Sequence, residues 1–210
     1  ASVEQERGVL VGLVLRIDGE QLRARVRHDA RHVARTPQRE LRGERLEPLD
    51  VAEAELVGFL GEEPVEVFAT ASCLVDPRIA EAGDVDTAVV MLTHENGCIT
   101  TIDNSRQAVY GYDQRVEAFG SGGMAASENP STHTGVRRTA EGTFGTTIPY
   151  FFLDRYIPSY VDEWKAFVQY VTEGGPSPVD ADAGRAPLVI GLAAGLSVRE
   201  GRSVRCSEIG

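Results

Sequence analysis

The sequence predicts an α+β domain with a largely antiparallel sheet and helices packed on one of its faces. Segments in the middle of the chain alternate apolar and polar residues with the period of two that is typical of strands. Two later segments repeat apolar residues every three or four positions, as amphipathic helices do. Because the strands precede the helices and do not alternate with them, the helices are expected on one side of the sheet.

The first fifty residues differ in composition from the remainder. Residues 1–50 contain ten Arg and nine acidic residues, whereas residues 51–210 contain eleven basic and twenty-three acidic residues. Residues 9–17 are apolar enough for a buried strand, but residues 21–45 follow no clear strand or helix period. We therefore expect an irregular Arg-rich extension over residues 1–50 and the α+β domain over residues 51–210.

The elements of the domain are predicted in order along the chain. Residues 49–60 have the apolar side of a short helix, and residues 64–72 alternate as a strand does. Residues 87–93 and 98–103 predict a hairpin, because Asn96-Gly97 suits a type I′ turn with two positive φ angles. Further strands are predicted over residues 115–119 and 134–139.

Two helices are predicted near the end of the chain, over residues 158–172 and 185–199. Pro158 suits the first turn of the former, and a glycine at position 201 ends the latter. Their predicted apolar faces are formed by Ile157, Val161, Trp164, Val168 and Val171 in the first helix, and by Leu188, Leu192 and Leu196 in the second.

Charge and cysteine content limit the partners and the compartment. A net charge of −11 argues against a nucleic-acid partner, since phosphate binding depends on clustered cations. Cys73, Cys98 and Cys206 match neither a disulfide framework nor a Cys-x-x-Cys metal site. The first residues do not resemble a signal peptide, and residues 9–17 are too few to cross a bilayer. We expect a cytoplasmic protein that does not associate with membranes.

Hydrogen-bonding side chains are concentrated just beyond the second strand of the predicted hairpin. Planar donors and acceptors at the end of a strand suit a polyhydroxylated ligand. The members of this cluster are Asn104, Arg106, Tyr110, Tyr112, Asp113 and Gln114.

The same region carries a family resemblance. Residues 85–124 read VDTAVVMLTHENGCITTIDNSRQAVYGYDQRVEAFGSGGM, and they are followed by Asp154-Arg155-Tyr156, by Tyr160 and by the final GRAPLVIGLAAGLSVREGRSVR. This order resembles the C-terminal domain of the glucose-fructose oxidoreductase and inositol dehydrogenase (Gfo/Idh/MocA) family, most of all the inositol 2-dehydrogenases. The resemblance covers roughly residues 61–205. It implies the substrate-binding and oligomerisation half of an NAD(P)-dependent oxidoreductase whose N-terminal Rossmann domain is missing here.

The resemblance also implies which side chains meet the substrate. Tyr112 and Asp113 lie where the family positions the hydroxyls of inositol or a related sugar, and Tyr110, Arg155 and Tyr160 are weaker candidates. Each residue also has a structural interpretation. Tyr110 and Tyr160 suit core positions with a solvated hydroxyl, and Arg155 has Asp154 or Glu163 as ion-pair partners.

No cofactor-binding or metal-binding residue is predicted in the chain. Residues 120–125 have the spacing of a dinucleotide fingerprint, but Asn129-Pro130 leaves no room for the helix whose N-terminus binds pyrophosphate. A glycine turn between two strands is the better interpretation. His28 and His32 have the spacing of a metal pair but no third ligand nearby.

No catalytic residue is predicted either. The resemblance implies an acid–base Lys and His, but Lys165 lies on an amphipathic helix and Ala54 stands where the His is expected. Loss of an acid–base group costs roughly 10²- to 10⁴-fold in rate, and loss of the cofactor domain removes the hydride acceptor. We therefore expect the chain alone to be inactive.

Three interpretations of function remain open. The first is the substrate and oligomerisation domain of an enzyme that oxidises a polyol CH–OH to a ketone, with its Rossmann half lost or on a separate chain. The second is a non-catalytic remnant, or truncated product, that self-associates through its sheet face as a homo-oligomer. The third is a stand-alone module that binds a polyol.

Overall fold

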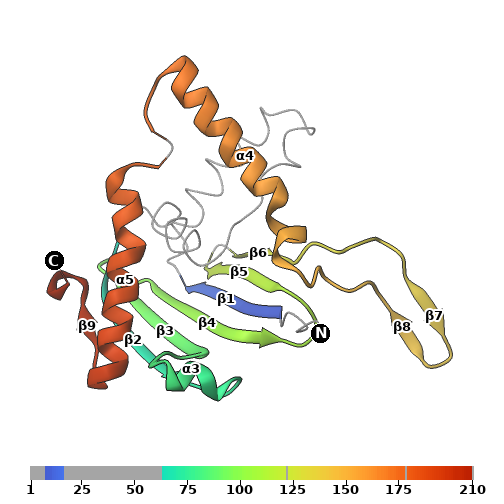
Figure 1. Ribbon diagram of the computed structural model, residues 1–210, viewed down its shortest axis with the longest axis horizontal. Helices are drawn as coiled ribbons and strands as arrows, with labels where there is room; N and C mark the ends of the chain where they lie inside the picture. The colour runs from blue at the N-terminus through green and yellow to red at the C-terminus, as the bar shows by residue number, and fades with distance from the viewer. Residues whose placement is uncertain (1–7, 17–62, 122, 178, 210) are drawn as a thin grey trace.

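The computed structural model describes residues 8–16, 63–121, 123–177 and 179–209. Its centre is a seven-stranded sheet in the order β6-β5-β1-β4-β3-β2-β9 (Figure 1). Neighbouring strands are antiparallel except β1 and β5, which run parallel. The predicted α+β class with a largely antiparallel sheet is confirmed. The strands are β1 (Gly8–Arg16), β2 (Pro64–Ser72), β3 (Thr87–His94), β4 (Ile99–Ala108), β5 (Asp113–Gly120), β6 (Gly123–Ser127) and β9 (Val204–Arg205).

Residues 8–16, within the segment expected to be an irregular extension, form β1, in agreement with the apolar run over residues 9–17 that suited a buried strand. These residues lie in the middle of the sheet, with Gly12 opposite Asp103 of β4 and Arg115 of β5. The apolar sequence of this strand, GVLVGLVLR, suits a central position. The boundary near residue 50 and the helix predicted over residues 49–60 lie outside the described residues.

The β3–β4 hairpin forms where it was predicted, but its turn is not of type I′. Gly97 has a φ of +82°, and no described residue other than glycine has a positive φ. The N–H of Gly97 donates to the carbonyl of His94 at 3.0 Å. Asn96 keeps a negative φ, and its Oδ1 accepts from the N–H of Cys98 at 2.8 Å. One glycine therefore supplies the whole reversal, as in three-residue hairpin loops with a glycine bulge.

Helix α5 (Ala181–Glu200) covers β2 and β9 with small side chains. It begins at Asp180, whose side chain accepts from the N–H of Ala183, and ends as predicted at Gly201, with φ of +65°. The predicted leucine face is wrong at Leu188 and Leu192, which are 62% and 52% exposed, whereas Leu196 is partly buried and packs against the core. Small side chains let the helix approach the sheet closely. The buried residues of α5 are Ala186, Ile190, Ala193 and Ser197. Of these, Ile190 and Ala193 belong to the hydrophobic core with Val67, Leu92, Ile102 and Val204.

The length and apolar content of α5 are also those of a membrane-crossing helix. Among the described helices, it is the one whose length and apolar content would suffice to cross a membrane. A core helix that buries Ile190 and Ala193 against a sheet has the same composition.

Helix α4 (Phe152–Glu173) begins six residues earlier than predicted, so that Pro158 lies inside it and not in its first turn. Its buried residues are Arg155 and Tyr156. The apolar stripe that was expected to face the core is exposed instead, with Trp164 at 66% and Val171 at 64%. This helix is therefore attached to the domain through polar contacts at its start.

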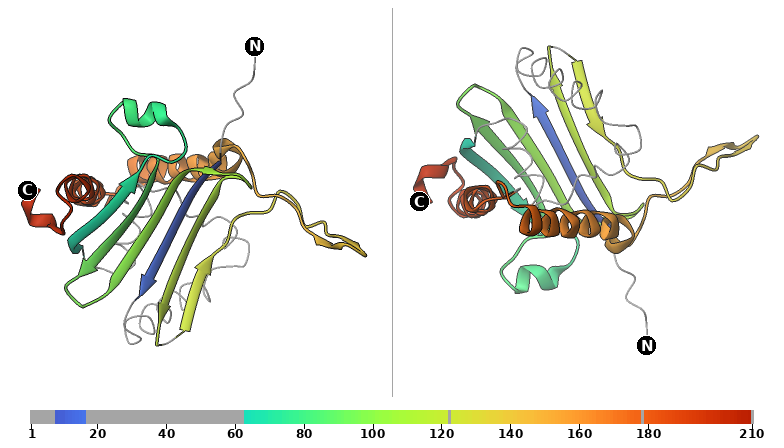
Figure 2. Two further views of the ribbon diagram at one scale, coloured as in Figure 1. Left: turned by 90° about the horizontal axis from the view of Figure 1, so that it is seen from below. Right: turned by 90° about the horizontal axis from the view of Figure 1, so that it is seen from above.

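The two long helices lie on one side of the sheet, as predicted (Figure 2). The opposite face carries large exposed apolar side chains, among which Phe68 pairs with Met91 and Phe119 with Met124 across neighbouring strands. The short helix α3 (Pro77–Glu81) lies at one end of β2 and β3. The last segment, η1 (Cys206–Glu208), follows β9.

A separate two-stranded ribbon extends from the domain (Figure 1). It contains β7 (Arg137–Thr139), which falls within the predicted strand over residues 134–139, and β8 (Gly142–Phe144). The chain enters it from β6 and returns to α4.

Candidate functional site

The segment between β4 and β5 is held by a glycine that no other residue can replace without strain. Gly111 has a φ of +136° and is buried. A Cβ at this position would overlap the side chain of Ile148. The N–H of Tyr112 donates to the carbonyl of Pro149 at 2.8 Å. Two turns of chain that are far apart in sequence are thus fixed against each other, and they orient the tyrosines on either side of Gly111.

Asp113, at the start of β5, is the buried centre of the site. Its carboxylate accepts hydrogen bonds from the hydroxyl of Tyr110 at 2.5 Å and from Arg115 at 2.8 and 2.9 Å. It also accepts one from Nδ2 of Asn129. Burial opposes ionisation, but the hydrogen bonds from Arg115, Tyr110 and Asn129 outweigh it and lower the pKa of Asp113. The carboxylate is therefore an ionised scaffold whose lone pairs are largely occupied.

The same contacts shift the pKa values of its partners. The hydrogen bond to Asp113 raises the pKa of Tyr110, and burial and the negative charge act in the same direction. The ion pair likewise raises the pKa of Arg115. Tyr110 is therefore a neutral donor, with half of its surface exposed.

Arg155 of α4 joins the helix to β5 and is nearly fully buried. Its Nε donates to Oε1 of Gln114 at 3.1 Å, and the guanidinium also donates to the backbone carbonyl of Gln114 at 3.1 Å. A third hydrogen bond reaches Oδ1 of Asn129 at 3.0 Å. The acceptors of these three hydrogen bonds are oxygens of Gln114 and Asn129. A planar guanidinium with several fixed acceptors suits a positioning role.

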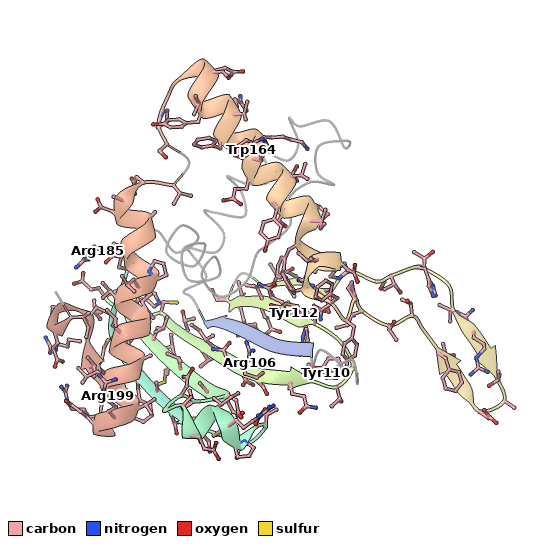
Figure 3. The ribbon with its side chains drawn as sticks, in the orientation of Figure 1. Arg106, Tyr110, Tyr112, Trp164, Arg185 and Arg199 are labelled. Atoms are coloured by element: carbon pink, nitrogen blue, oxygen red, sulfur yellow. The ribbon has the colours of Figure 1, made fainter. Side chains whose placement is uncertain are left out.

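Tyr112, labelled in Figure 3, and two tyrosines of α4 have their rings beside this network. The rings of Tyr112 and Tyr156 meet edge to face, with centroids 5.5 Å apart and planes at 86°. Tyr160, one helical turn further along α4, has its ring centroid 6.3 Å from that of Tyr156. The hydroxyl of Tyr156 is buried and donates to Oε1 of Gln114 at 2.6 Å. We call the surface formed by Tyr110, Tyr112 and Tyr160 the tyrosine wall.

The structure brings the predicted site residues together but separates their functions. Tyr110, Tyr112 and Tyr160 are at least partly exposed, so their rings are available to a ligand. Asp113 and Arg155 are buried. Asp113 accepts from Tyr110, and Arg155 donates to Gln114, which also accepts from Tyr156. The sequence interpretation missed Asn129, because it was considered only as a residue that prevents a helix. Its signal was an amide followed by proline at the end of a strand.

Lys165 and the glycine-rich segment have structural roles. Lys165 is exposed and pairs with Asp162 at 2.8 Å. Gly120 and Gly123 pair with each other at the β5–β6 turn, so the glycine-rich segment is a hairpin and does not precede a helix. A depression at the other edge of the sheet is lined by β2, β9 and η1, including Glu63, Glu66 and Arg205, and contains no tyrosine.

Comparisons with known proteins identify the family. Residues 54–126 match the model of the GFO/IDH/MocA C-terminal domain. This chain carries a Gfo/Idh/MocA C-terminal domain. It is similar to the myo-inositol 2-dehydrogenase of Thermotoga maritima, at 48% identity over 151 residues, and to the inositol 2-dehydrogenase of Rhizobium meliloti, at 39% over 146 residues. These alignments cover 72% and 70% of this chain.

A solved structure agrees with these relatives. The crystal structure of a probable dehydrogenase from Thermotoga maritima superposes with a TM-score of 0.76 at 37% identity, and it covers 98% of this chain. The chain spans about half the length of its relatives: 45% of the Thermotoga enzyme, 44% of the Rhizobium enzyme and 58% of the crystallised protein. The Gfo/Idh/MocA domain described above therefore corresponds to part of a longer protein in each case.

Proposed function

We propose that this domain supplies the polyol-binding and self-association half of an inositol 2-dehydrogenase-like oxidoreductase, which oxidises a ring CH–OH to a ketone. The observation that carries the proposal is the tyrosine wall. Exposed rings with hydroxyls, held by a buried polar network, suit a ligand that has apolar ring faces and equatorial hydroxyls. The inositol dehydrogenases among the relatives support inositol as the polyol.

In this proposal the wall and its support have separate roles. Tyr112 and Tyr160 contact the polyol, and Tyr110 contributes its exposed ring edge. Asp113 positions Tyr110 directly. Arg155 acts indirectly, because it fixes Gln114, which accepts from Tyr156. The ring of Tyr156 packs in turn against Tyr112. Preorganised contacts of this kind reduce the entropy cost of binding.

Oxidation of a CH–OH group requires a hydride acceptor, and the family relationship supports NAD(P) in that role. The described residues do not fit a dinucleotide. Their glycine-rich segment forms the β5–β6 hairpin, in which Gly120 pairs with Gly123, and no helix N-terminus follows it. The cofactor domain would belong to the same protein or to a separate polypeptide.

The direct test is an exchange of domains. The 151 residues of the Thermotoga maritima enzyme that align with this chain are replaced by their counterparts from this chain. The exchanged enzyme is expected to reduce NAD⁺ when myo-inositol is added, whereas the 210-residue chain alone is expected to produce no NADH. An exchanged enzyme that folds and binds NAD⁺ but oxidises no inositol isomer would contradict the proposal.

The uncovered sheet face favours a second function, self-association. Phe68, Val89, Met91, Ile99, Phe119 and Met124 are exposed on this face. An apolar surface of this kind usually marks an interface. We expect a homo-oligomer, and Met91→Glu should weaken it because a charge is then buried against apolar side chains. Sedimentation equilibrium measures the effect, and a monomeric wild-type chain at all concentrations would contradict it.

A further inference from the structure

The ribbon between β6 and α4 extends from the edge of the sheet, away from α5 (Figures 1 and 2). Its two strands pair from Arg137 opposite Phe144 to Thr139 opposite Gly142. Residues 131–145 are all exposed. An isolated pair of strands is only marginally stable in water. An extension of this length is therefore expected to gain stability from contact with a partner.

The base of the ribbon is attached to the β4–β5 connection and the start of β5, on both its outgoing and its returning side. On the outgoing strand, Oδ1 of Asn129 accepts from the N–H of Gln114 at 2.8 Å. On the returning strand, the hydroxyl of Tyr150 donates to the carbonyl of Val109 at 3.1 Å. Between them, the N–H of Thr132 donates to the carbonyl of Thr147 at 3.3 Å. The ribbon leaves the domain in a fixed direction, so its tip is preorganised for binding.

The tip has the chemistry of a protein interface. The guanidinium of Arg137 lies over the ring of Phe144, 4.4 Å from its centroid. Val136 is 48% exposed beside them. Arginine and aromatic side chains are enriched where protein interfaces gain most of their affinity. Arg137 and Arg138 against Glu141 make the tip cationic, although the chain as a whole has a charge of −11.

We propose that residues 131–147 form an arm that grips a second copy of this chain through Val136, Arg137 and Phe144. The inference rests on the self-association proposed above and specifies a further part of the interface.

Two observations favour a second copy as the partner. A chain of charge −11 offers acidic surface, such as the exposed Glu163 and Glu173 of α4, that complements the cationic tip. The arm also follows directly from β6, which carries Met124 on the uncovered sheet face. An arm at the edge of a self-associating face is placed to reach past that edge onto the other copy.

The test measures self-association of the 210-residue chain by sedimentation equilibrium over a range of concentrations. Phe144→Glu removes the aromatic contact, and replacement of residues 134–145 by a Gly-Gly turn removes the tip. Thr143→Ser, on the same strand, is the matched control. Both arm variants are expected to raise the dissociation constant by about tenfold or more. Thr143→Ser should leave it unchanged. Circular dichroism should be the same for the wild type and the two single substitutions, since the altered residues are exposed, and the tip deletion should lose only the strand signal of β7 and β8.

Each other outcome has a defined meaning. Equal dissociation constants for the wild type and both arm variants would overturn the proposal that the arm contacts a second copy. If Met91→Glu still weakens assembly in that case, the sheet face alone is the interface. A wild-type chain that stays monomeric would overturn both the arm contact and the sheet-face interface. The activity of the exchanged enzyme tests the substrate independently of these results.

Discussion

The two long helices, α4 and α5, are attached to the domain by opposite kinds of contact. α5 buries Ala186, Ile190 and Ala193 against the sheet, whereas α4 buries Arg155 and Tyr156 and leaves its apolar stripe exposed. The helix with the more regular apolar stripe is thus the less buried one. A stripe predicts that a helix forms, but close packing against a sheet is decided by small side chains that permit a short approach.

The largest expected effect is the difference in stability lost when an apolar side chain of each helix is truncated to alanine. Ile190→Ala removes a buried side chain from the core beneath α5 and should lower the free energy of unfolding by roughly 2–5 kcal/mol. Val171→Ala, on the exposed stripe of α4, should change it by less than about 0.5 kcal/mol. Urea unfolding followed by circular dichroism compares the two. Equal losses would show that α4 is packed as tightly as α5.

A smaller loss of stability is expected when the hydrogen bond between Ser197 of α5 and the backbone of β2 is removed. The side chain of Ser197 is fully buried, accepts from the N–H of Ala69 at 2.9 Å and donates to the carbonyl of Arg202 at 2.6 Å. Ser197→Ala leaves that N–H unsatisfied and should cost about 1–3 kcal/mol of stability. The exposed Ser207→Ala is the control. A loss no larger than that of the control would mean that the N–H finds another acceptor.

The polar attachment of α4 is tested by a conservative change. Arg155→Lys keeps the charge but cannot supply the planar donors that reach Gln114 and Asn129. We expect a loss of about 1–2 kcal/mol. Lys165→Arg, on the exposed part of the same helix, should have no measurable effect. Thermal unfolding of the two variants measures the difference, and unchanged stability of Arg155→Lys would argue against the network as the attachment.

The carboxylates of Asp86 and Asp113 should affect stability through protonation only in acid, so this effect is the smallest at neutral pH. Burial opposes ionisation of Asp86, but the N–H groups of Asp76, Leu74 and Val75 donate to its carboxylate and hold its pKa far below the ordinary value. The pKa of Asp113 is lowered as well. A folded pKa below the unfolded value of about 4 means that the stabilisation is complete above that pH and is lost as the pH falls.

Stability measured by urea unfolding should therefore decline below about pH 5. Asp86→Asn, which keeps the shape of the side chain but not its charge, should reduce the slope of that decline. A slope identical to that of the wild type would contradict the assignment to Asp86.

The sequence predicted β2, β3, β4 and β5 and the cluster of polar residues, because these depend on local patterns, but no bounds were predicted for β6, β8 or β9. The period of two predicted β2, the Asn96-Gly97 turn predicted the hairpin of β3 and β4, and Tyr110, Tyr112 and Asp113 were found because they lie within four residues of one another. The network around Asp113 could not be predicted, since Asn129 and Arg155 reach it from elements that come together only in the fold. Likewise, the choice between the leucine and alanine faces of α5 depends on the distance to the sheet, which periodicity does not report.

The proposal that the tyrosine wall binds the polyol is tested most directly in the exchanged enzyme. The quantity measured is kcat/KM for myo-inositol, with Tyr112→Ala compared with Tyr170→Ala, a tyrosine of α4 outside the wall. We expect Tyr112→Ala to lower kcat/KM by about tenfold or more, with the affinity for NAD⁺ unchanged and Tyr170→Ala fully active. Equal kcat/KM values for the two variants would contradict a role for the wall in substrate binding.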